Sequence, residues 1–199
     1  MYFIILIIIF FFIIKNPNDF STTFISLSSS VSNIGVSLNG SYQNISFALL
    51  IITIIGGSFF STSSGIRLVK IYSLFKFSIN ELASHAKPLN IYINKLEFSQ
   101  SKLETSDINK YFISVLIFVL SLFVLSSLLT ISGINLESAF KLSILTLMNT
   151  VNSSMHGLND FNFNDLQYFT KYFLIIFMVI GRVELLTLLI IIKKFIFKN

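Results

Sequence analysis

The chain contains no cysteine and few charged residues. The absence of cysteine excludes a disulfide framework and any metal site built from thiolates. Lys, Arg, Asp and Glu make up 12% of the 199 residues, whereas a soluble domain usually carries about 25%. Apolar residues make up 54% and include 23 phenylalanines. Because these residues are concentrated in long blocks that water cannot cover, the composition indicates an integral membrane protein.

The sequence also lacks the residue patterns of common enzyme classes. It has no His/carboxylate metal spacing, no nucleophile elbow and no phosphate-binding glycine motif. The two histidines, His85 and His156, lie far apart in the sequence, which favours solvated or structural roles over a shared metal site. We therefore predict no enzymatic activity and no cofactor. A membrane-embedded enzyme or assembly factor would need a cluster of titratable groups at one depth, for which Arg182 and Glu184 are the candidates.

Apolar segments alternate with polar ones along the chain. Residues 2–14 form an unbroken apolar run that covers about 20 Å as a helix, whereas the hydrocarbon core is about 30 Å thick. No basic region precedes this run and no small-residue cleavage site follows it, so we interpret it as a truncated span rather than a signal peptide. Residues 111–131 and 169–197 are full-length candidate spans, and residues 47–77 form a span that is interrupted in its middle.

Two short helices are expected at about residues 19–32 and 136–148. The first is too polar and too short to cross a bilayer. Asp19 and Asn135 are candidate N-caps for these helices. Each helix follows a span and precedes a polar turn, so we expect both to dip into the membrane without crossing it.

The order span, short helix, polar turn, span occurs twice along the chain. The two copies occupy residues 1–77 and 111–199, and they are separated by a charged linker over residues 78–110. This internal repeat of architecture predicts an all-α integral membrane protein with two equivalent repeats.

The basic residues are distributed asymmetrically, and the net charge is +5. Most of them fall in or beside the linker or in the tail, namely Arg67, Lys70, Lys76, Lys87, Lys95, Lys102, Lys110, Lys193, Lys194 and Lys198. The loops on the opposite side carry only Lys15, Lys141 and Lys171. Because cytoplasmic loops carry an excess of Lys and Arg, we predict a multi-pass protein whose linker and carboxy terminus are cytoplasmic. The same reading predicts no nucleic-acid partner.

The two polar turns are candidate ion-binding segments. Residues 32–37 read Ser-Asn-Ile-Gly-Val-Ser, and residues 149–154 read Asn-Thr-Val-Asn-Ser-Ser. An irregular turn at membrane depth leaves backbone groups unpaired, which is tolerated where the backbone lines a watery cavity or is buried in protein. Carbonyl oxygens in such a turn can replace the water shell of an alkali cation. Ordinary extracellular loops are the alternative interpretation, against which the short helix that precedes each turn argues.

A break in the second span is the stronger signal. Residues 56–65 read Gly-Gly-Ser-Phe-Phe-Ser-Thr-Ser-Ser-Gly, and a continuous helix would place these hydroxyl groups in lipid. An unwound stretch lining a pore could instead move between two positions and gate the path. The alternative is a kinked helix whose Ser and Thr side chains bond back to its own carbonyls. Arg182 lies within the last span, where a charge usually faces a cavity or a partner; a structural position near the membrane surface is its alternative.

Three motifs resemble the Trk/Ktr family of potassium transporters, also called the TrkH superfamily. Residues 56–67, ending in Gly-Ile-Arg, resemble its intramembrane loop Gly-Gly-x-x-x-Ser-Thr-x-x-Gly-Ile-Lys. Residues 181–189, Gly-Arg-Val-Glu-Leu-Leu-Thr-Leu-Leu, resemble the Gly-Arg-hydrophobic-Glu-x-x-Thr signature of its last helix. Residues 87–92, Lys-Pro-Leu-Asn-Ile-Tyr, resemble the linker after its third repeat. The motifs follow the family's order and cover essentially the whole chain.

The resemblance implies half of a potassium-channel-like pore. The family has four repeats of helix, pore helix, filter turn and helix around one pore, and this chain would supply the third and fourth. The implied filter residues, whose backbone would bind potassium, are Asn33, Ile34, Gly35, Thr150, Val151 and Asn152. The implied gate residues are Gly56, Gly57, Ser61, Thr62 and Gly65, and Arg182 would project towards the pore. The chain departs from the family's usual glycines at Asn149, Asn152, Ser63 and Ser64.

The function that the resemblance implies is potassium uptake across the bacterial cytoplasmic (inner) membrane. The potassium ion would be the transported substrate, and no cofactor is implied. The implied partners are a chain carrying the missing amino-terminal repeats, a second full pore in a homodimer, a cytoplasmic nucleotide-binding regulatory subunit and the lipid bilayer. A non-conducting fragment of a split or decaying transporter gene is the alternative, and the DNA upstream of Met1 would distinguish the two.

Overall fold

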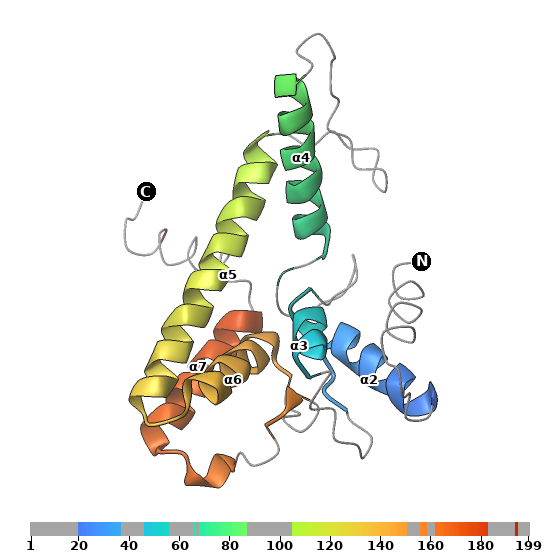
Figure 1. The fold of residues 1–199 in the computed structure, drawn as a ribbon. Helices are drawn as coiled ribbons and strands as arrows, with labels where there is room; N and C mark the ends of the chain where they lie inside the picture. The colour runs from blue at the N-terminus through green and yellow to red at the C-terminus, as the bar shows by residue number, and fades with distance from the viewer. Residues whose placement is uncertain are drawn as a thin grey trace.

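The computed structural model describes residues 20–36, 46–55, 66, 68–86, 105–150, 156–158, 162–182 and 194. Within these residues the chain forms six α-helices and one 3-10 turn, and no β-strand. The elements are α2 (Phe20–Ser32), α3 (Ser46–Ile55), α4 (Leu68–Ala86), α5 (Thr105–Ile131), α6 (Leu136–Met148), η2 (Phe163–Asp165) and α7 (Tyr168–Arg182) (Figure 1). The predicted all-α fold class is confirmed.

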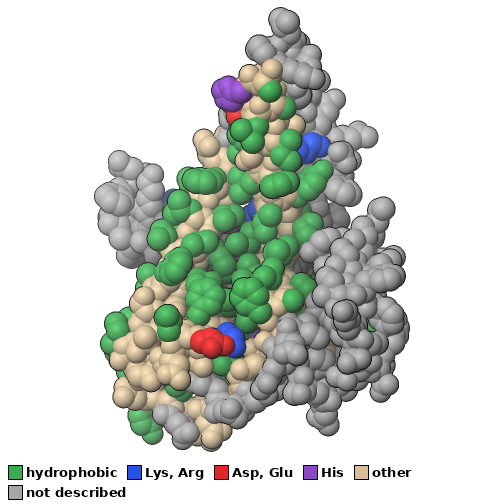
Figure 2. Space-filling model, viewed as in Figure 1, with side chains coloured by type: hydrophobic (Ala, Val, Ile, Leu, Met, Phe, Trp, Pro, Cys, Tyr) green, Lys and Arg blue, Asp and Glu red, His purple; other side chains and the backbone are tan. Residues whose placement is uncertain are grey.

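Helix α5 is long and apolar enough to cross a membrane. Its 27 residues extend over about 40 Å, which exceeds a hydrocarbon core of about 30 Å. Among the described residues it is the one helix that meets the length and hydropathy of a span, over Ser106–Ile131. Leu125 and Leu129 on α5 are fully buried, whereas Phe123 is exposed. Figure 2 shows hydrophobic side chains gathered over the face that α4 and α5 form, as a lipid-facing surface requires.

Helix α4 packs against one end of α5 (Figure 1). Lys70 Nζ donates a hydrogen bond to Ser114 Oγ at 3.0 Å and so joins the two helices. Ser73 is buried, and its hydroxyl donates to the Val69 carbonyl at 2.7 Å. Both polar side chains are therefore satisfied where α4 and α5 meet.

Both of these helices extend into the segment that the sequence analysis interpreted as a linker. Helix α4 continues to Ala86, and α5 begins at Thr105, so the linker predicted over residues 78–110 is helical at its two ends. The ion pair between Lys110 and Asp107, at 2.8 Å, explains why polar residues are compatible with helix here. An i, i+3 pair of opposite charge stabilises an exposed helix without any apolar face.

Helix α6 is short, and its carboxy-terminal half is enclosed by its neighbours α5, α7 and α3. Residues 142–148 are all buried, although they include Ser143 and Thr146. Each of these two hydroxyls donates at 2.7 Å to a carbonyl of the preceding turn, so the helix carries its polar groups into the core already paired. Asn135 occupies the N-cap position, as predicted, but makes no side-chain cap hydrogen bond.

Helix α7 packs along α6 and touches it at Gly181. A Cβ atom placed on Gly181 would collide with the carbonyl oxygen of Leu147, in the last turn of α6. The missing side chain therefore allows the two helix backbones to meet. The last helix was expected over about residues 169–197; beyond Arg182, only Lys194 lies within the described residues, and it is helical.

Candidate ion-binding turns

Helix α2 ends in a residue with left-handed backbone conformation. Asn33 has a φ of 55°, and its amide donates to the Ser30 carbonyl at 3.4 Å. The amide of Ile34 donates to the Ser29 carbonyl at 3.1 Å. These two bonds form a Schellman motif, which turns the chain away from the helix axis. Gly35 follows with a φ of 82° and is buried, so this position favours glycine for its backbone.

Helix α6 ends in the same way. Asn149 has a φ of 56°, and its amide donates to the Thr146 carbonyl at 3.1 Å. The amide of Thr150 donates to the Leu145 carbonyl at 2.9 Å. Helices α2 and α6 each have 13 residues, so the two short helices match in length, in their last hydrogen bonds and in the asparagine that follows them. The repeat of architecture is therefore also a repeat of backbone geometry.

The carboxy-terminal ends of these two helices lie close together. Asn33 Nδ2 is 4.0 Å from Met148 Sδ, a weak N–H···S contact between residues 115 positions apart. Met148 is the last residue of α6, and Asn33 directly follows α2. Helix α2 also packs with α3, which in turn contacts α6. The turns after α2 and α6 therefore start from one region of the molecule.

The electrostatics of this region favour a cation. A helix carries about half a negative elementary charge at its carboxy-terminal end, and this partial charge attracts cations. Neither α2 nor α6 carries a basic residue in its last turn, so no Lys or Arg within these helices neutralises it. Two helix ends that meet in one region add their fields, and the carbonyl oxygens there are the ligands that a dehydrated alkali cation requires.

The two turns differ in exposure. Ile34 and Val36, on either side of buried Gly35, are 65% and 53% exposed. Thr150 is only 2% exposed, and its Oγ1 has no hydrogen-bond partner among the described residues. Behind Thr150, between α6 and α7, lies an apolar pocket of about 350 Å³ that Met178 also lines. The first turn thus has an open side, whereas the second turn is buried at Thr150.

The structure covers part of the predicted site. Asn33, Ile34, Gly35 and Thr150 lie in the two turns described above, and Arg182 is the exposed last residue of α7, next to Gly181. The remaining predicted residues lie outside the described residues, namely Val151 and Asn152 of the second turn and Gly56, Gly57, Ser61, Thr62 and Gly65 of the gate loop. Helix α3 ends at Ile55, directly before that loop.

The two caps pair Asn33 with Asn149 and Ile34 with Thr150. The bonds that define the caps join backbone atoms three and five residues apart, and the sequence alone does not reveal them.

Sequence reasoning missed a contact that fixes the second turn. Asn149 Nδ2 donates to the Met178 carbonyl of α7 at 3.0 Å, across 29 residues of chain. Asn149 entered the sequence analysis only as a position where the family often has glycine. The signal that could have identified it is the asparagine that follows each of the two short helices.

His156 is fully buried, and neither ring nitrogen has a hydrogen-bond partner among the described residues. Burial lowers the pKa of His156 to about 4, because the apolar surroundings disfavour the charged imidazolium. The neighbouring Gly157 lies against Ser46 and Lys141. Of the two roles that the sequence left open, the structural one therefore fits this histidine better than the solvated one.

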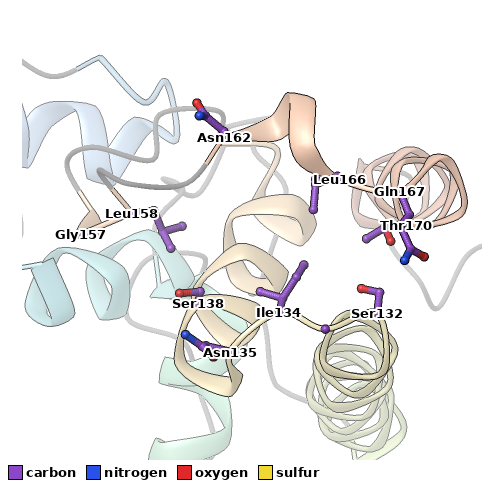
Figure 3. A pocket seen from close by; sticks show the side chains of 11 residues that line it. Ser132, Ile134, Asn135, Ser138, Gly157, Leu158, Asn162, Leu166, Gln167 and Thr170 are labelled. Atoms are coloured by element: carbon purple, nitrogen blue, oxygen red, sulfur yellow. The ribbon is translucent and has the colours of Figure 1, made fainter.

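A polar pocket of about 570 Å³ lies at the opposite end of α6 from the turns. Figure 3 shows its lining, in which Ser132 and Asn135 precede α6, Ser138 lies on it, and Thr170 belongs to α7. The hydroxyl and amide groups that line it can donate hydrogen bonds to water and accept them from it. This pocket is separate from the two helix ends.

Comparison with known proteins supports the fold. No protein-family model matches the chain, and no curated protein matches its sequence significantly. Among solved structures, the crystal structure of the potassium transporter TrkH from Vibrio parahaemolyticus is similar, with a TM-score of 0.81 and 24% sequence identity. The similarity covers 95% of this chain and 42% of that chain. The chain therefore has the fold of part of that transporter and spans less than half of its length.

Proposed function

We propose that the chain is a member of the Trk/Ktr (TrkH) family and forms half of a potassium pathway through the cytoplasmic membrane. Helices α2 and α6 act as the pore helices of its two repeats, and the turns after them supply carbonyl oxygens to the ion. The observation that carries the proposal is the meeting of two 13-residue helices that end in the same cap. The similarity to a potassium transporter supports potassium as the ion.

The mechanism rests on backbone dipoles rather than on acidic side chains. An ion that leaves water needs oxygen ligands at each step of its path, and a turn at a helix carboxy terminus provides carbonyl oxygens together with the negative end of the helix dipole. Gly35, with its left-handed φ of 82°, allows the first turn to present its carbonyls without a side chain in the way. The ion therefore binds weakly enough at each position to move on.

A complete pathway needs further repeats. Ile34 and Val36 are exposed beside the first turn, and the chain spans 42% of the similar transporter. Half a pore would leave carbonyl groups facing lipid, which the bilayer does not tolerate. We propose that a second polypeptide supplies the two missing repeats and that two full pores pair as a homodimer. A nucleotide-binding regulatory subunit would bind on the cytoplasmic side.

The gate and the charge on the last helix complete the proposal. The loop that contains Gly56, Gly57, Ser61, Thr62 and Gly65 connects α3 to α4 and would close the path below the turns. The positive charge of Arg182 would raise the electrostatic barrier that a cation meets on the path. Alternatively, Arg182 would anchor this loop. The alternative is a non-conducting fragment of a split or decaying transporter gene.

Potassium-limited growth and rubidium uptake test this proposal in cells that lack their own potassium transporters. Three strains are compared. The first expresses the chain alone, and the second expresses it together with the product of the reading frame immediately upstream. The third expresses that product with the Gly35→Ala variant of the chain. We expect uptake only when both products are present, and a marked loss with Gly35→Ala. Membrane insertion without any uptake in all three strains would instead support the non-conducting fragment.

A further inference from the structure

The side chain of Asn149 makes a hydrogen bond that a helix cap alone does not need. Glycine adopts left-handed backbone angles at lower cost than asparagine and is the usual residue at this position of a Schellman motif. Asn149 nevertheless has a φ of 56°, and its side-chain amide reaches the Met178 carbonyl at 3.0 Å. The residue therefore combines the backbone conformation of a cap with a hydrogen bond to the next helix.

The hydrogen bond lies beside a rigid contact between the same two helices. Gly181 on α7 meets the backbone of Leu147 on α6. Met178 precedes Gly181 by three residues, and Asn149 follows Leu147 by two, so the hydrogen bond and the backbone contact lie on the same face of α7. With two neighbouring attachments, the end of α6 cannot slide or rotate against α7 without breaking one of them.

The first turn has a comparable arrangement. Asn33 has the same backbone conformation as Asn149, and its side-chain nitrogen lies 4.0 Å from the Sδ of Met148, the last residue of α6. Each cap asparagine therefore contacts a residue of another helix through its side chain: Asn33 contacts α6, and Asn149 contacts α7.

We propose that Asn149 is a positioning residue for the second ion-binding turn, which it holds in place through the Met178 carbonyl. The hydrogen bond sets the position of Thr150 relative to α7. The geometry makes α7 and the turn move together. This inference rests on the proposed function for its consequence in ion selection, whereas the attachment itself can be measured without transport.

Cysteine labelling measures the attachment directly, because the natural chain contains no cysteine. Thr150→Cys provides the reporter thiol, since Thr150 is 2% exposed and its hydroxyl makes no hydrogen bond within the described residues. The full chain in membranes, expressed with the upstream product, is labelled with a maleimide. In this background, Asn149→Gly keeps the cap and removes the amide, and Asn149→Asp keeps the size but replaces the donor with an acceptor. Asn135→Gly is the matched control, because Asn135 lies at the other end of α6 and makes no side-chain cap bond.

We expect Asn149→Gly to raise the labelling rate of the reporter thiol by about fivefold, which corresponds to the loss of one net hydrogen bond. Asn149→Asp should raise it further, because a carboxylate would face the Met178 carbonyl. Asn135→Gly should leave the rate unchanged. If Asn149 acts only as a helix cap, the glycine variant should label as slowly as the parent, and the Asp variant should differ little from it. Equal labelling rates of this kind, or an equal increase in the Asn135→Gly control, would overturn the proposal.

Two further measurements complete the test. If Thr150→Cys does not insert into membranes, hydrogen exchange of a peptide covering residues 145–150 in the cysteine-free chain gives the same comparison between variants. In transporting cells, Asn149→Gly should lower the preference for potassium over sodium, and Asn135→Gly should not. Faster labelling with unchanged preference would overturn the role in ion selection. Absence of transport in every strain would count against the proposed function while the labelling order still decides the attachment.

Discussion

Replacing Gly181 with alanine should destabilise the protein, although the same change stabilises most helices. In an isolated helix, alanine is favoured over glycine by about 1 kcal/mol. Here the added Cβ would collide with the Leu147 carbonyl oxygen, which is backbone and cannot turn aside like the end of a flexible side chain. Helix α7 must therefore move away from α6, at an overpacking cost of about 1–3 kcal/mol.

The displacement also strains the neighbouring attachment. Met178 lies one turn before Gly181, so a shift of α7 lengthens its 3.0 Å hydrogen bond from Asn149. Losing that bond costs about 1 kcal/mol more. Together, and after subtracting the gain in helix propensity, we expect a net loss of about 1–3 kcal/mol in the free energy of unfolding.

Thermal unfolding in detergent, followed by circular dichroism at 222 nm, measures this loss. For a chain of this size, we expect Tm to fall by roughly 3–10 °C. Gly133→Ala is a useful comparison, because Gly133 has a φ of 94° but nothing within 4 Å of its added Cβ, so only backbone strain is tested there. An unchanged or higher Tm for Gly181→Ala would show that the two helices are not in backbone contact, and the close packing of α6 against α7 would have to be abandoned.

Three further predictions concern single residues. Gly35→Ala should cost about 1–2 kcal/mol through its left-handed φ of 82° and should reduce Tm, whereas Ile34→Ala, at an exposed neighbour, should leave Tm nearly unchanged. The pKa of His156 is lowered to about 4 by burial and is about 6.5 when unfolded, so its unfolded state binds more protons between these values. Stability should therefore fall by about 2 kcal/mol as the pH drops from 7 to 5, and His156→Leu should remove that dependence in thermal unfolding. Lys141 lowers the pKa of exposed Glu137 by a hydrogen bond and by its charge, so the contribution of this pair is present above about pH 4.3 and lost as the pH falls through the folded pKa; Glu137→Gln should abolish that step.

The local features of the fold follow from local features of the sequence. The apolar run that predicts a span at residues 111–131 lies within α5, and short helices lie at Phe20–Ser32 and Leu136–Met148, close to where they were expected before the polar turns. These elements depend on residues close in sequence, and periodicity carries that information. Polarity was a poorer guide, because α4 and α5 both continue into the charged segment, where the exposed pair of Lys110 with Asp107 lies on α5.

The contacts that build the site depend on residues far apart in sequence. Asn149 meets Met178, and Gly181 meets Leu147, only because α7 packs along α6. No pattern within either helix specifies that crossing. The family resemblance identified Gly181 and Arg182 as a signature but gave the glycine no physical role. The steric contact with Leu147 supplies that role, because any side chain at position 181 would separate the two helices.

The cap of α6 and the close contact between α6 and α7 lie within a few residues of each other. A Schellman cap fixes the direction in which the chain leaves each short helix, because two amides are bonded back to the last turn. In the second repeat, the side-chain amide of Asn149 then fixes that cap to α7. A movement of α7 must consequently either break this hydrogen bond or carry Thr150 and its turn with it. Because Gly181 leaves no space between the two backbones, carrying the turn along needs the smaller rearrangement. A displacement of α7 would then reach the turn after α6 without an intermediate element.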